Sequence, residues 1–269
     1  TADGIGWRVD LRLRPDPGAT AVSIDIDAAI GYYESLARTW ERAAFIRARP
    51  IAGDLQIATR FLSQIQPFIW RRTLDYTVMD DMKTMLRRPP QSNGWLGYNL
   101  KIGKNGIRSI EFFTHVLQLV AGGREPGLRQ HQTAAALRAL AKFNWITANQ
   151  ADSLIDAYHQ LRRTEHRIQM LSDSQTHRLP RSDSEFEHFA NFMGHAKAAD
   201  LCAALTAVQD IITIHAEHKI FHSPTDHTAS HKNILLDDYD TLVAWLAQNG
   251  FARPNDCLLY TSPSPRDNR

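Results

Sequence analysis

Hydrophobic and polar residues alternate strictly through residues 6–15, and this period of two predicts a strand. The apolar side would carry Trp7, Val9, Leu11 and Leu13. The opposite side would carry Arg8, Asp10, Arg12 and Arg14. Residues 21–26 also alternate, so we expect a second short strand that pairs with the first as a hairpin.

From residue 28 onward the apolar positions recur every three or four residues, which predicts helices almost to the end of the chain. The first would span 28–49, with Arg47 and Arg49 in its last turn, and Pro50 and Gly53 would end it. A stripe of Ile57, Phe61 and Ile65 follows. Further helices are expected from about 107 with Ile110, Phe113, Leu117 and Val120 inward, at 131–143, at 151–172, within 184–220, and at 239–251.

Composition narrows the class of protein without selecting a function. The chain has 269 residues, 43% hydrophobic and 22% charged, as in an ordinary globular protein. A net charge of +2 gives no global reason to expect a nucleic-acid or membrane partner. The two cysteines are too few for a disulfide framework, and no signal peptide or apolar run of about 18 residues is visible. We therefore expect a cytoplasmic protein without a membrane-spanning helix.

Candidate chemistry begins with Asp10, a single carboxylate among three arginines on the polar side of the first predicted strand. An acid flanked by guanidinium groups suits a site that holds a metal cation and a polyphosphate together. Alternatively, the strand is simply amphipathic and Asp10 pairs with its neighbours. The pattern alone leaves both interpretations open.

A second acidic pair, Asp25 and Asp27, has the spacing that lets two carboxylates bridge two metal ions on a strand. This pair lies at a turn into a helix, so we favour Asp27 as an N-cap. Glu165 and His166 could suggest metal ligation, but adjacent helical residues diverge by about 100°. A structural polar network with Arg162 and Gln169 is the favoured interpretation there.

The stretch from Asn99 to Ile107 is the other candidate, because Gly103 and Gly106 form a loop that opens a helix. Such loops can present free backbone N–H groups to an anion, and Lys101 and Arg108 flank this one. A simple tight turn is the alternative interpretation.

Several blocks in order resemble one family, the glutamine synthetase adenylyltransferase/adenylyl-removing enzymes of the polymerase-β-like nucleotidyltransferases. These blocks are residues 9–15, 40–42, 47–54, 101–103, 106–112, 122–126 and 161–169. The resemblance implies a mainly α fold, with the C-terminal remnant of a nucleotidyltransferase α+β domain followed by a helical bundle domain. We expect a truncated nucleotidyltransferase domain at 1–54, a bundle at 55–221, a linker and the start of another module at 222–256, and a non-native tail at 257–269.

The resemblance also implies a reaction, a cofactor and partners. Such enzymes attach AMP from ATP to a tyrosine of glutamine synthetase, and remove it with phosphate to release ADP. Asp10 would be the third metal carboxylate for Mg²⁺, and Arg12, Arg14, Lys101 and Arg108 would bind nucleotide or phosphate. Glutamine synthetase and the PII signalling protein would be partners. Residues 68–72 and 122–126 look more like the adenylyl-removing half.

This sequence departs from the family pattern at Asn105, where a glycine is usual, and at Ser109, where an acid is usual. Asn tolerates a left-handed backbone, so we expect the turn at Asn105 to survive. The chain opens with Thr1 almost directly on a strand, so we expect a fragment without the upstream DxD and without activity of its own.

Two other functions stay open at this stage. One is a helical regulatory or docking module without chemistry. The other is a protein related to PII uridylyltransferases, against which the blocks at 40–42 and 106–112 argue.

Overall fold

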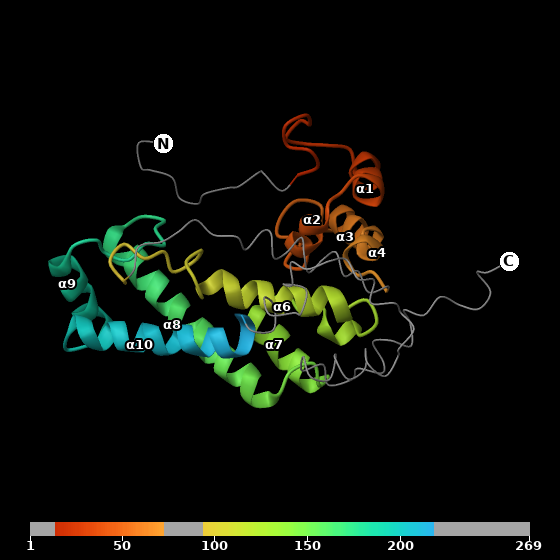
Figure 1. Cartoon of the computed structure of the whole chain (residues 1–269). Helices are drawn as coiled ribbons and strands as arrows, with labels where there is room; N and C mark the ends of the chain where they lie inside the picture. Colours follow the sequence, from red (N-terminus) through yellow and green to blue (C-terminus); the bar gives the residue numbers. More distant parts are fainter. Residues whose placement is uncertain (1–13, 73–93, 218–269) are drawn as a thin grey trace, which may run out of the picture.

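The computed structural model describes residues 14–72 and 94–217, and within these ranges the protein is helical (Figure 1). The elements in order are α1 (Ile26–Ser35), α2 (Thr39–Phe45), α3 (Leu55–Gln64), α4 (Gln66–Ile69), α6 (Ile107–Ala121), η1 (Pro126–Leu128), α7 (Thr133–Lys142), α8 (Ala148–Ser172), α9 (Asp183–Met193), α10 (Ala198–Ile212) and the π-turn η2 (Thr213–Glu217). The mainly α prediction is confirmed. The described residues form no strand, only an isolated bridge between Asn99 and Arg178, so the α+β remnant stays a prediction.

The predicted strand at residues 21–26 is wrong, because residues 21–25 form bends and irregular chain and α1 begins at Ile26. Asp25 is extended, and its Oδ1 accepts hydrogen bonds from the backbone N–H groups of Asp27 (2.9 Å) and Ala28 (3.2 Å). Asp25 therefore caps the helix, and the N-cap prediction for Asp27 is wrong by two residues. The predicted strand at 6–15 lies almost wholly outside the described residues, as do the linker, the helix at 239–251 and the tail.

The helix predicted at 28–49 is two helices, α1 and α2. The Glu41 carboxylate accepts a 2.7 Å hydrogen bond from the backbone N–H of Arg38, which starts α2 separately. Because α2 ends at Phe45, Arg47 and Arg49 lie beyond it, and their predicted place in its last turn is wrong.

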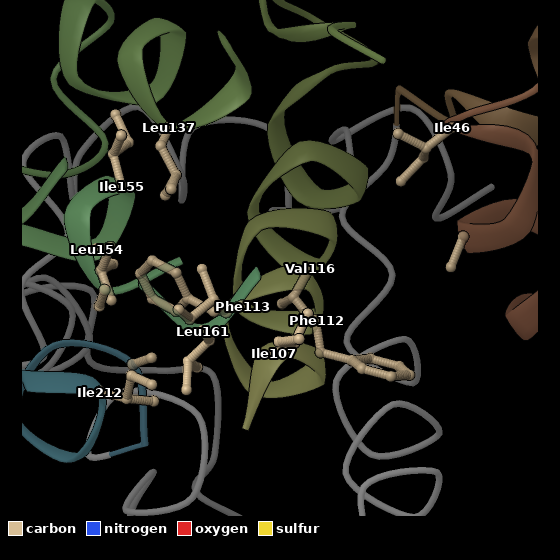
Figure 2. Close-up of a cluster of buried hydrophobic side chains, with 14 of the residues drawn as sticks. Ile46, Ile107, Phe112, Phe113, Val116, Leu137, Leu154, Ile155, Leu161 and Ile212 are labelled. Carbon is tan, nitrogen blue, oxygen red and sulfur yellow. The ribbon is translucent and has the colours of Figure 1, made fainter. Parts of the chain in front are cut away.

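The helices from α6 onward form a bundle in which α8 contacts α6, α7, α9 and α10 (Figure 1). Phe113 of α6 points toward Leu154 and Leu161 of α8, and all three are buried (Figure 2). The predicted helices at 131–143, 151–172 and 184–220 are confirmed, the last as α9, α10 and η2. Ile110 is buried as expected, whereas Leu117 and Val120 are only half-buried against the core.

Helices α1–α4 pack beside α6, where Ile46 and Ile69 join the same buried cluster. Within this group the Tyr33 ring lies edge-on to Phe45 and Phe61, at centroid distances of 4.8 and 5.9 Å. The packing thus continues across residue 54, and the predicted division of the chain there stays a prediction. Of the predicted stripe on α3, Ile65 is buried but Ile57 is 54% exposed.

One helical stretch, Ala198–Ala216, is long and apolar enough to cross a membrane by length and composition alone, contrary to expectation. A single such helix is weak support for a membrane protein, since core helices pass the same test. Here Leu201, Leu205 and Val208 are buried in the core. The prediction of no membrane partner therefore remains a prediction.

Candidate functional site

Asp10 and Arg12, the predicted metal and phosphate residues, lie outside the described residues. Arg14 is described, and its Nη2 donates to the carbonyl oxygens of Pro17 (2.8 Å) and Thr20 (3.5 Å). Its guanidinium thus closes the turn after the predicted strand. The phosphate-binding role of Arg14 stays a prediction, and any ligand would share the guanidinium with these carbonyls.

The acidic pair at 25 and 27 serves the start of α1. Asp25 is the cap, and exposed Asp27 pairs with Arg60 at 3.5 Å, on the neighbouring helix α3. Within residues 14–72 and 94–217, no three His, Cys, Asp or Glu side chains gather as a metal site. A Mg²⁺ site would therefore need ligands from elsewhere, Asp10 among them.

The loop before α6 does not offer the predicted cradle of free N–H groups. The backbone N–H groups of Ile107, Arg108 and Ser109 donate to the carbonyls of Leu100, Lys101 and Gly106, at 2.9–3.0 Å. Those of Gly103 and Gly106 are satisfied as well, and Asn99 Oδ1 accepts from those of Lys101 and Ile102 at 3.0 Å. The tight-turn interpretation is correct, because the helix-opening donors are already used.

The expectation for Asn105 is confirmed, since its φ is +55°, in the left-handed region. The side chain is buried, and its Nδ2 donates to Thr213 Oγ1 (2.5 Å) and to the Gln209 carbonyl (3.3 Å). Asn105 therefore joins the loop to α10 and η2, a role that a glycine could not fill.

The structure brings Lys101 and Arg108 together, through the 3.0 Å hydrogen bond from Arg108 N to Lys101 O. The Arg108 guanidinium lies 4.7 Å above the Phe112 ring. Burial lowers the pKa of Arg108, and nearby Glu111 opposes that shift. Lys101 and Arg108 therefore stay predicted phosphate ligands. Their side chains, and not the backbone N–H groups, would make the contacts.

A polar cluster around Glu111 was not recognised in the sequence. Glu111 on α6 pairs with Arg47 at 3.1 Å and accepts a 3.3 Å hydrogen bond from Tyr158 OH on α8. Arg47 also donates to Thr133 Oγ1 of α7 at 2.5 Å. This cluster joins the segment after α2 to three helices of the bundle. Residues 47 and 111 are far apart in the chain, so no local period could have linked them.

His115 lies one helical turn beyond Glu111. Burial, reinforced by the positive charge of Arg47, lowers the pKa of His115 to about 3. The imidazole is therefore neutral at ordinary pH and adds no charge to the cluster.

The polar network expected around Glu165 is confirmed. The buried carboxylate pairs with Arg162 and with Nδ1 of His177, each at 2.6 Å. His166 is exposed, so the histidine in the network comes from the loop after α8 instead. This arrangement ties that loop to the helix and is structural.

Comparison with known proteins gives two family-model matches. The model described as GlnD PII-uridylyltransferase matches residues 79–218, and the model described as glutamate-ammonia ligase adenylyltransferase matches residues 1–64. The first match includes residues 106–112. The block at residues 106–112 therefore does not distinguish adenylyltransferases from PII uridylyltransferases, contrary to the expectation from the sequence.

Curated relatives cover nearly the whole chain. The bifunctional glutamine synthetase adenylyltransferase/adenylyl-removing enzyme of Xanthobacter autotrophicus is 49% identical over 264 residues, which is 94% of this chain and 26% of the relative. The enzyme of the same name from Rhizobium meliloti is 44% identical over 266 residues, 95% of this chain and 27% of the relative. The chain thus spans about a quarter of the length of these relatives.

Proposed function

Because the chain belongs to the family of the bifunctional glutamine synthetase adenylyltransferase/adenylyl-removing enzymes, we propose that it forms part of a nucleotidyltransferase that regulates glutamine synthetase. The observation that carries this proposal is an identity of 44–49% to two such relatives over at least 94% of the chain. The proposed partners are glutamine synthetase and the PII signalling protein, in the cytoplasm.

The proposed reaction is displacement at the phosphorus of AMP. In adenylylation a tyrosine hydroxyl oxygen of glutamine synthetase attacks the α-phosphorus of ATP, diphosphate leaves, and the hydroxyl proton is released. In the separate removal reaction an oxygen of inorganic phosphate attacks the phosphorus of the AMP group, the bond to the tyrosine oxygen breaks, that oxygen takes up a proton, and ADP is released. We assign this chain to the adenylyl-removing half, on the residues at 68–72 and 122–126.

Asp10 is the proposed metal ligand of this chain, and bound Mg²⁺ would neutralise charge on the phosphate oxygens. Arg12 and Arg14 would fall on the same side as Asp10 if the predicted strand forms, and their guanidinium groups could then contact phosphate oxygens. Lys101 and Arg108 would add positive charge at the start of α6. The backbone there is already hydrogen-bonded, so only their side chains would contact a ligand.

The 269-residue chain alone should be inactive, because a single carboxylate cannot hold two divalent ions against their hydration. The test is to mix the purified chain with adenylylated glutamine synthetase and phosphate, and to measure ADP. We expect no release above background. Turnover by the isolated chain would overturn this part of the proposal.

A chimera separates an enzyme from a docking module. This chain would replace the matching 264 residues of the Xanthobacter relative, and Asp10→Asn would be compared with Asp16→Asn, an exposed carboxylate of the turn after Arg14. We expect Asp10→Asn to abolish ADP release while binding of glutamine synthetase persists, and Asp16→Asn to keep both. If Asp10→Asn retains turnover, the assignment of Asp10 is wrong.

A second candidate function is uridylylation of PII, favoured by the family-model match over residues 79–218. The same chimera, given PII and UTP, distinguishes the two. We expect no uridylyl transfer, because the curated relatives that match nearly the whole chain carry the adenylyltransferase name.

A further inference from the structure

An apolar groove lies between the turn after Arg14 and helices α1 and α3. We call it the α1–α3 groove, and its volume is about 460 Å³. Its lining is apolar except for Asp54 and the Tyr33 hydroxyl, and consists of Pro15, Ile24, Ile26, Ala29, Tyr33, Phe45, Asp54, Ile57, Ala58 and Phe61. Asp54 is occupied as the cap of α3, so the groove presents a mainly apolar surface.

The rim of the groove exposes large aliphatic side chains. Ile57 is 54% exposed and Ile24 is 38% exposed. None of the ten residues of α3 is buried, although one side of this helix is apolar. A contiguous apolar surface of this kind marks a place where another segment packs.

We propose that the α1–α3 groove receives the apolar side of residues 7–13 of this same chain. Pro15 is buried in the lining, so the described part of the chain meets the groove one residue after Arg14. The preceding residues supply an apolar row at alternate positions: Trp7, Val9, Leu11 and Leu13. Seven extended residues span about 23 Å, so a segment that turns back at Arg14 is long enough to lie along the groove.

Alternation then fixes the direction of Asp10. With Leu11 turned toward α3, Asp10 and Arg12 point away from the helices. The importance of this direction for substrate rests on the proposed function, in which Asp10 faces the substrate. The packing of residues 7–13 in the groove does not depend on that function.

Cysteine pairs in the full chain test the packing directly. In a Cys202→Ser, Cys257→Ser background, Leu11→Cys would be combined with Ile57→Cys and oxidised mildly. The matched control is Arg12→Cys with Ile57→Cys, one residue along on the opposite side. Because disulfides need Cβ atoms within about 4 Å, we expect at least about tenfold more intramolecular disulfide from the Leu11 pair. Equal yields from the two pairs would overturn the proposal.

Accessibility of the groove gives a second, independent measurement. Ile57→Cys would be labelled with a maleimide in the parent chain and in a Val9→Asp, Leu11→Asp variant, with Met170→Cys, exposed on α8, as control. We expect labelling of Ile57→Cys to rise severalfold in the variant and that of Met170→Cys to stay unchanged. Unchanged labelling of Ile57→Cys would contradict the proposal.

Protection that depends on protein concentration, with intermolecular cross-links, would instead show a second copy in the groove and would also overturn the proposal. None of these readouts requires enzymatic activity. A failure here is therefore distinct from a failure of the proposed function, which the chimera reports through ADP release.

Discussion

At the scale of single residues, Glu111 joins parts of the chain that are far apart in sequence. It is 15% exposed, pairs with Arg47 and accepts from Tyr158, so it joins the segment after α2 to α8. Arg47 is 39% exposed, and solvent weakens the ion pair accordingly. Glu111 therefore contributes to stability mainly by holding together segments that are distant in sequence.

We expect Glu111→Gln to lower the free energy of unfolding by about 1–2 kcal/mol, because Arg47 loses its countercharge while the Tyr158 hydrogen bond can persist. Urea titration followed by circular dichroism measures the change. The control is Asp156→Asn on exposed α8 surface, which should shift the midpoint very little. A loss no larger than the control's would show that the cluster contributes nothing to stability.

His115 should make stability depend on pH in the acid range. Its folded pKa, about 3, lies below the ordinary value of 6.5, so the unfolded chain binds the proton more readily. The stabilisation is present above pH 6.5 and is lost as the pH falls from there toward 3. Between pH 7.5 and 5.5 we expect a loss of about 1 kcal/mol from this group.

Urea midpoints measured at both pH values test this, with His115→Gln as the variant that cannot titrate and His159→Gln, exposed on α8, as the control. The pH dependence should shrink in His115→Gln and persist in His159→Gln. Identical pH dependence in all three proteins would refute the shifted pKa.

At the scale of elements, the start of α6 shows how a turn and a helix are fixed together. Asn105 adopts φ +55°, and a Cβ on Gly106 would come within 2.5 Å of the Leu100 carbonyl. Chain geometry thus demands a left-handed residue followed by a glycine, and the loop carbonyls satisfy the first donors of the helix.

We expect Asn105→Ala to destabilise the protein by about 1 kcal/mol more than Asn105→Gly, because Ala resists the left-handed backbone and both lose the same side-chain bonds. Asn144, exposed with φ +60°, is the matched position without those bonds. There the Ala–Gly difference should recur, while the Gly variant alone should cost little. Thermal unfolding would measure all four variants, and equal effects of Ala and Gly at Asn105 would refute the strain.

At the scale of the whole molecule, one buried cluster runs from α1 through η2, and Figure 2 shows the part of it around Phe113 and Leu161. Ile46 and Ile69 from the N-terminal helices belong to it together with Phe113 and Leu154 of the bundle. Elements that share a continuous core lose their packing together.

We therefore expect the described helices to unfold in a single transition. Urea curves from far-ultraviolet circular dichroism and from tryptophan fluorescence should coincide, with Trp40 reporting on the helices before residue 54 and Trp145 on the bundle. Two separated transitions would instead support independent units, as the predicted division at residue 54 implies.

The sequence by itself determined the helical character, most of the bundle helices, the left-handed turn at Asn105 and the family. The spacing of apolar residues and the residues that form turns are local features of the sequence. They specify the same helices and turns in any fold that buries the apolar stripes. Local pattern misplaced the start of α1, because alternation at residues 21–26 resembles a strand until Asp25 caps the backbone that follows.

Only the tertiary structure decided which polar groups are already paired with other groups of the protein. The N–H groups at the start of α6 donate to carbonyls of the loop before it. Arg47 does not interact with the end of a helix, as the sequence predicted, but pairs with Glu111, 64 residues away in the chain. A hydrogen-bonding group is available for a ligand only when no closer partner satisfies it. Partners brought together by packing leave no trace in local sequence, so tertiary contacts settled those questions.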